Sequence, residues 1–140
     1  NAFSGYKIPI IIYDPSVNEK KINEGLASQF DIMGTVLATA GYKDSVITYG
    51  RNLLDSNSVS QFVFAKPNSY LYQVTDSAYV LGFNVITDKA EYLFNYKKDE
   101  ALKKNLLQDK NASAILAKLT IQVKAFIQKA GLHYNSRQVK

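Results

Sequence analysis

Five aspartates beside apolar runs or in turns are the residues whose type and position could do acid–base chemistry. They are Asp14, Asp44, Asp55, Asp76 and Asp88. Paired carboxylates can transfer protons or hold Mg²⁺, and Asp14 directly follows an apolar run, where α/β enzymes often place catalytic groups. Each position is also one where Asp is favoured for hydrogen bonds to the nearby backbone. We therefore predict no catalytic residue, and an enzyme that uses Asp14 with a neighbouring carboxylate remains an alternative.

Other chemistries lack the residues they need. The chain has no cysteine and a single histidine, His133, beyond the expected end of the last helix. This composition excludes disulfides and thiolate nucleophiles, and it argues against a histidine-rich metal site. The nucleophile elbow G-x-S-x-G and the glycine-rich phosphate loops do not occur. We expect a non-enzymatic protein with no metal and no cofactor.

Aromatic residues between 69 and 96 are the first candidate binding surface. The chain holds 10 Tyr and 7 Phe, and side chains alternate faces along a strand. This alternation predicts one large aromatic face that includes Tyr72, Tyr79, Phe83 and Tyr92. Tyrosine is favoured at interfaces because its ring is large and its tip is polar. The alternative, which the apolar stripes of the helices favour, is that the helices cover this face as core.

Lysines in the C-terminal third are the second candidate surface. Residues 97–140 carry ten Lys or Arg and three Asp or Glu, whereas residues 1–96 carry seven and nine. Lys97, Lys98, Lys103 and Lys104 are the most concentrated group, and such groups can bind nucleic acid or an anionic membrane. The lysines of the last helix scatter around its axis, so the alternative is an ordinary solvated helix surface.

A polar loop over residues 50–60 is the third candidate. It contains Arg51 and Asp55 among Asn and Ser residues, and loops of this kind often carry binding residues on a rigid scaffold. We include both residues among the predicted contacts.

The elements that must position these residues follow from hydrophobic periodicity and turn signals. Strands are predicted over 7–13, 45–49 and 61–65, and three more within 69–96, where Thr, Asp and Ser triplets separate aromatic and β-branched runs. A helix is predicted from the capping box 16–19 to Gly41, a short one after residue 98, and a strongly amphipathic one over 115–130 that ends at Gly131.

The fold class predicted from this order, β-α-β-β-β-β-β-α-α, is α+β. We expect a mostly antiparallel sheet of five to six strands, packed against an N-terminal helix and the C-terminal helices. The strand, helix and strand at the N-terminal end could form one parallel crossover. The 140 residues correspond to a single domain, with residues 132–140 as a flexible tail.

The function predicted is a non-enzymatic binding or assembly module with a protein or cell-envelope partner. Because the chain begins without Met, we expect a processed or truncated product, exported to the periplasm or cell envelope as a lipoprotein-type domain. No run approaches the roughly 20 apolar residues of a membrane span. The alternative is a cytoplasmic protein that contacts nucleic acid or anionic lipid through its basic C-terminal helices.

Overall fold

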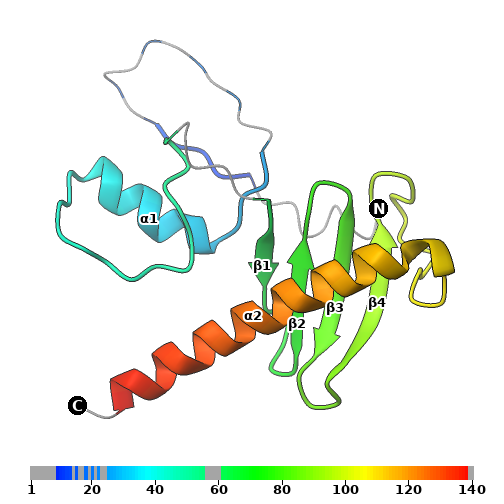
Figure 1. Cartoon of the computed structure of the whole chain (residues 1–140). Coiled ribbons are helices and arrows are strands. Elements are labelled where there is room, and N and C mark those ends of the chain that lie inside the picture. Colours follow the sequence, from blue (N-terminus) through cyan, green and yellow to red (C-terminus); the bar gives the residue numbers. More distant parts are fainter. Residues whose placement is uncertain are drawn as a thin grey trace.

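A four-stranded antiparallel sheet crossed by one long helix is the main structural unit (Figure 1). The computed structural model describes residues 9–13, 15, 18, 20, 22, 25–55 and 61–138, with side chains as far as residue 132. The strands lie in chain order: β1 (Val63–Ala65), β2 (Leu71–Thr75), β3 (Tyr79–Asn84) and β4 (Lys89–Asn95). A 3₁₀ turn, η2 (Lys110–Ala112), leads into α2 (Ser113–Gln138), and α1 (Phe30–Thr39) lies beside the sheet.

Short polar side chains close the turns that lead into and connect the strands. Asp76 Oδ1 accepts hydrogen bonds from the backbone N–H groups two and three residues ahead, at 2.9 and 2.7 Å. Asn84 Oδ1 does the same at 2.8 and 3.1 Å, and Asn68 Oδ1 at 3.1 and 2.8 Å. These local bonds reverse the chain and fix the strand register. The three strands predicted within residues 69–96 are therefore confirmed.

The core lies between the sheet and α2. Leu119 and Val123 of α2 are fully buried and pack against Val74, Leu81 and Leu93. The predicted apolar stripe of the last helix is confirmed, but the predicted end at Gly131 was wrong. The helix continues through Gln138, because one glycine costs about 1 kcal/mol in a helix interior and does not by itself end the helix.

The aromatic residues do not share one face, which corrects the predicted surface for Tyr92. Leu81 of β3 pairs with Leu93, and Gly82 pairs with Tyr92, so Tyr92 lies on the face opposite the core. Its ring covers Gly82, where an added Cβ would lie 2.3 Å from the ring, and its hydroxyl donates to Gln73 Oε1 at 3.0 Å. A one-residue change of register exchanges the faces of a strand, and the alternation within β4 cannot reveal which residue of β3 it opposes.

The prediction of a five- to six-stranded sheet was wrong, although the chain is α+β. The described residues 9–13 and 45–49 form no strand, and residues 7 and 8 of the first predicted strand lie outside the described residues. A strand forms only where a neighbouring strand satisfies its backbone groups. Apolar, β-branched runs therefore predicted the propensity of these segments but not the presence of a partner.

The two remaining helix predictions were also inaccurate. The helix predicted from residue 16 begins only at Phe30, and most of its predicted capping box lies outside the described residues; it ends as predicted near Gly41, whose φ is +71°. The helix predicted after residue 98 is absent from this fully described segment. There Asp99 Oδ2 accepts from the backbone N–H of Lys104 at 2.7 Å, and such local bonds compete with helix formation.

Candidate functional site

Two buried polar side chains hold α1 against the loop that follows it. Asp31 and Thr35 lie one turn apart and are each only 4% exposed. The Asp31 carboxylate accepts from the backbone N–H of Ser28 at 2.8 Å and of Arg51 at 2.9 Å. The Thr35 hydroxyl donates to the Asp31 carbonyl at 2.8 Å and accepts from the Leu53 N–H at 3.0 Å. Hydrogen bonds to a carboxylate are about twice as strong as neutral ones, so Asp31 is the main anchor.

Two glycines allow the loop and the helix to approach closely. A Cβ added at Gly50 would lie 2.1 Å from the Phe30 carbonyl oxygen, and one added at Gly34 would lie 3.1 Å from the Arg51 carbonyl oxygen. The guanidinium of Arg51 donates to the Leu26 carbonyl at 2.7 Å. Arg51, predicted as a contact residue, is thus part of the local scaffold. We call these residues, with Asp31 and Thr35, the α1 clip.

The clip leaves the apolar side of α1 exposed. Ile32, Met33 and Val36 point outward, whereas the polar Asp31 and Thr35 are buried. Further exposed apolar side chains follow in the next loop: Tyr42, Val46 and Ile47. We call these six residues the α1 surface. Thirteen of the eighteen exposed large hydrophobic side chains among the described residues fall between residues 10 and 54. Exposed apolar side chains grouped in this way normally mark a surface that packs against another structure.

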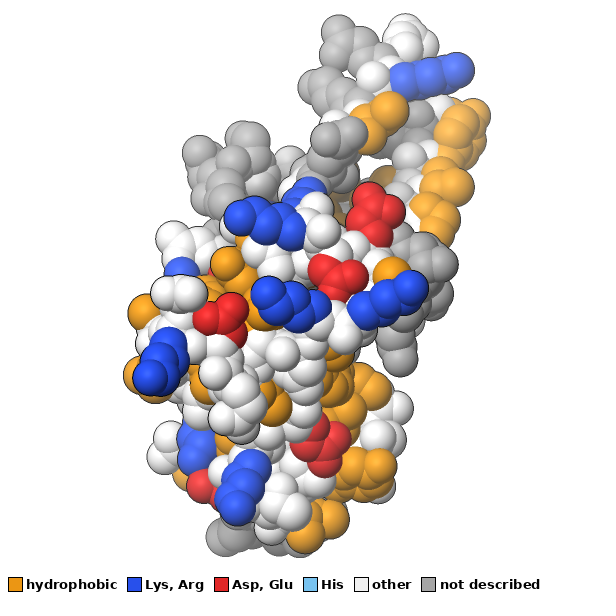
Figure 2. Space-filling view, turned by 90° about the vertical axis from the view of Figure 1, so that its right-hand side faces the viewer, with side chains coloured by type: hydrophobic (Ala, Val, Ile, Leu, Met, Phe, Trp, Pro, Cys, Tyr) orange, Lys and Arg blue, Asp and Glu red, His pale blue; other side chains and the backbone are white. Residues whose placement is uncertain are grey.

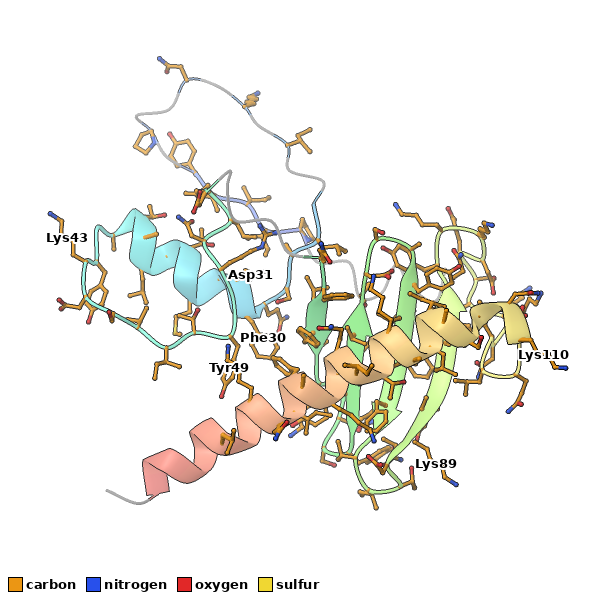
Figure 3. All side chains as sticks on the ribbon, viewed as in Figure 1. Phe30, Asp31, Lys43, Tyr49, Lys89 and Lys110 are labelled. Atoms are coloured by element: carbon orange, nitrogen blue, oxygen red, sulfur yellow. The ribbon has the colours of Figure 1, made fainter. Side chains whose placement is uncertain are left out.

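Five aromatic rings join the α1 part to the sheet and α2. Phe126 of α2 stacks on Phe64 with 4.3 Å between ring centroids, and it also contacts Phe30, Tyr49 and Tyr72 at 5.7, 5.8 and 6.4 Å. Figure 3 shows Phe30 and Tyr49 between α1 and α2. This cluster connects the first residue of α1 and the loop after it to the sheet and α2.

The other predicted aromatic contacts are mostly occupied within the chain. Phe83 is buried in the core, and Tyr72 and Tyr79 are half-buried and pack against it. Lysine ammonium groups lie over two of these rings: Lys66 is 5.3 Å from the Tyr72 centroid, and Lys124 is 5.2 Å from that of Phe83. The four predicted residues therefore do not form one open binding face.

The predicted lysines lie in the segment after β4. Lys97, Lys98, Lys103 and Lys104 are exposed there, but Asp99 and Glu100 lie between them in the chain. Figure 2, which views the side of the molecule that carries this segment, shows Lys and acidic side chains interspersed. The surface therefore lacks the single-sign field that steers polyanions to a protein.

The predicted carboxylates are scattered. Asp14 lies outside the described residues, Asp44 and Asp55 are exposed in loops, and Asp76 is buried in its turn. Asp88 pairs with Lys124 at 2.7 Å. Within the described residues, no three His, Asp or Glu side chains lie close enough together to hold a metal ion.

The hydroxyl of Tyr96 donates a hydrogen bond to the Asp76 carbonyl at 2.6 Å. Burial raises the pKa of this phenol, and the nearby charge of Asp76 raises it further.

Sequence reasoning missed Asp31 and Thr35. Their signal was available: Asp31, Thr35 and Thr39 recur every four positions in an otherwise apolar helix and occupy one side of it. None of the described helices is long and apolar enough to cross a bilayer.

Comparison with known proteins provides structural neighbours only. No protein-family model matches the chain, and no curated protein matches it in sequence. The fold is similar to part of a protein described as a sulfatase from Bacteroides thetaiotaomicron VPI-5482, with a TM-score of 0.59 and 21% identity over 76% of this chain. It is also similar to part of BT1596, described as a 2-O GAG sulfatase, with a TM-score of 0.60 and the same identity and coverage. This chain spans about a quarter of each neighbour, 25% and 26% of their lengths.

Proposed function

We propose that this chain is a non-catalytic assembly module that packs, through the α1 surface, against a larger body of the kind found in sulfatases, on the same polypeptide. The observation that carries the proposal is the inverted polarity of α1, in which Asp31 and Thr35 are buried whereas the apolar Ile32, Met33 and Val36 are exposed. A helix with apolar residues on its outer side normally packs them against another structure.

The likeness to two sulfatase structures supports the choice of partner. In each, a fold of this kind makes up about a quarter of a longer chain, so the same architecture occurs beside a larger body. Complete burial of a Val, Ile or Met side chain contributes about 1.5–3 kcal/mol, so six half-exposed side chains contribute roughly 5 kcal/mol or more before association costs. On one polypeptide, the high effective concentration makes such a contact stable.

The protein partner predicted from the sequence is kept in this proposal, as a larger body on the same polypeptide. The alternative partners, nucleic acid and anionic lipid, remain a prediction of the lysine content, and steep weakening of binding with salt would be their signature. The interspersed acidic residues beside Lys97–Lys104 favour the protein partner.

Binding between this chain and the separately produced remainder of its native polypeptide tests the proposal. Val36→Asp places a charge in the α1 surface, where Val36 is 58% exposed, and we expect it to weaken binding at least 30-fold by calorimetry, since an unpaired charge is costly to bury. The matched control is Ile86→Asp, because Ile86 is 78% exposed in the turn between β3 and β4, and it should bind normally.

Two outcomes would contradict the proposal. One is equal binding of the Val36 and Ile86 variants, which would remove the α1 surface from the contact. The other is an intact mass of the native protein close to the 15.7 kDa of this chain, which would leave no remainder to bind.

A further inference from the structure

We infer that residues 9–13 supply a β-strand to a sheet of the larger body, buried there on both faces. The inference rests on the proposed function, and it adds what this chain contributes to its partner: backbone hydrogen bonds as well as apolar surface. Four consecutive apolar residues, Ile10 to Tyr13, follow Pro9 and leave both sides of the segment apolar.

The exposure of these residues has the period of a strand. Ile11 and Tyr13 are 87% and 85% exposed, whereas Ile10 and Ile12 are 39% and 43% exposed. Side chains that alternate in this way point to opposite faces of an extended backbone. Because both faces are apolar, the segment matches strands that helices cover on both sides, rather than edge strands with one wet face.

The sheet of this chain does not accommodate the segment. The outer edge of β4 is occupied by the segment after it, since the Leu106 N–H donates to the Leu93 carbonyl at 2.7 Å and Asn105 Oδ1 accepts from the Leu93 N–H at 3.1 Å. The other edge strand, β1, has only three residues. Within the described part of the chain, the sheet contains β1 to β4 and no pairing with residues 9–13.

The composition of the segment is that of a strand which adds to an existing sheet. Three isoleucines and a tyrosine have high β-propensity, and five residues make an ordinary strand length. Pro9 has no N–H to donate, so it suits the first position of a strand. Addition to an exposed sheet edge gives affinity through main-chain bonds and specificity through alternate side chains. An exposed apolar strand without such a partner promotes aggregation.

Hydrogen exchange of the backbone amides of residues 10–13 tests the inference on the unmodified chain and on the native polypeptide. In the isolated chain we expect exchange within seconds. In the native polypeptide we expect alternate amides of this segment to exchange at least 100-fold more slowly, because every second N–H of a strand added at a sheet edge donates to the neighbouring strand. Equally fast exchange in both would overturn the inference.

Two substitutions at one position separate the strand from mere apolar contact. Ile11→Pro removes the N–H and should weaken binding to the separately produced remainder at least 30-fold. Ile11→Thr keeps the N–H and the β-branched shape, and it should weaken binding less than 5-fold. If both variants bind like the unmodified chain while Val36→Asp does not, the strand is wrong and the proposed function stands. If Val36→Asp also binds normally, the proposed function fails too.

Discussion

At the residue scale, the structure depends on a few positions where two backbone segments lie very close together. Only glycine and short polar side chains permit such close contact. Asp31 joins residues 28 and 51 through one carboxylate, and Gly50 brings the loop against the first residue of α1. These contacts turn the polar side of α1 inward. The exposed apolar side is thus a consequence of the clip and not of a loosely packed helix.

Alanine at two glycines should have opposite effects on stability. Gly50→Ala should lower the free energy of unfolding by roughly 2–4 kcal/mol, since its Cβ would overlap the Phe30 backbone. Gly131→Ala should raise it by about 0.5–1 kcal/mol, because this glycine lies in α2 with open space around it. Urea unfolding monitored by circular dichroism measures both, and a Gly50→Ala protein as stable as the unmodified chain would contradict the clip.

Several residue roles could be predicted from sequence, and the reason is that they are local. Asp76 closes its turn with bonds to residues two and three positions ahead, which a Thr-Asp-Ser triplet indicates directly. The role of Asp31 depends on Arg51, twenty positions away, and no periodicity within α1 reveals that partner. Tyr92 was placed on the wrong face for the same reason, since its position depends on pairing with Gly82.

At the element scale, α2 connects the sheet to the α1 part. Its 26 residues span roughly 39 Å at 1.5 Å per residue, which exceeds the width of four strands at about 4.8 Å spacing. Its N-terminal half packs on the sheet, and its C-terminal half runs past β1 on the side of the sheet where α1 lies (Figure 1). The amphipathic stripe predicted this helix and its packing, whereas the ring of Phe126 that meets α1 could not be distinguished from ordinary core.

Removal of the Phe126 ring should loosen α1 more than the sheet. Phe126→Ala should lower the free energy of unfolding by roughly 2–3 kcal/mol, less than for a fully buried Phe because the ring is half-exposed. The substitution should also speed amide exchange in α1, since the ring contacts Phe30. Phe94→Ala is the matched control, since Phe94 is also half-buried but stacks on Tyr92 of the same strand, β4, with 5.4 Å between ring centroids. Hydrogen exchange measured by mass spectrometry compares them. Unchanged exchange in α1 of the Phe126 variant would show that the aromatic cluster does not hold this helix.

At the scale of the whole molecule, the chain divides into a well-packed half and a half with its apolar residues exposed. The sheet and α2 bury their aliphatic residues against each other. Residues 9–13 and the α1 surface expose their apolar side chains. The sequence predicted strands and a helix in these segments, but none of them joins the sheet of this chain. A segment that adds a strand to another sheet is expected to have high strand propensity and no strand partner within its own chain.

The central claim is that the α1 surface is covered in the native protein, and Met33 reports on it directly. It is the only methionine in the chain and is 50% exposed on α1. Peroxide converts exposed methionine to the sulfoxide, which mass spectrometry detects as a gain of one oxygen. We predict that Met33 oxidises readily in the isolated chain and at least ten times more slowly in the native polypeptide. Equal oxidation rates in the two would contradict the account.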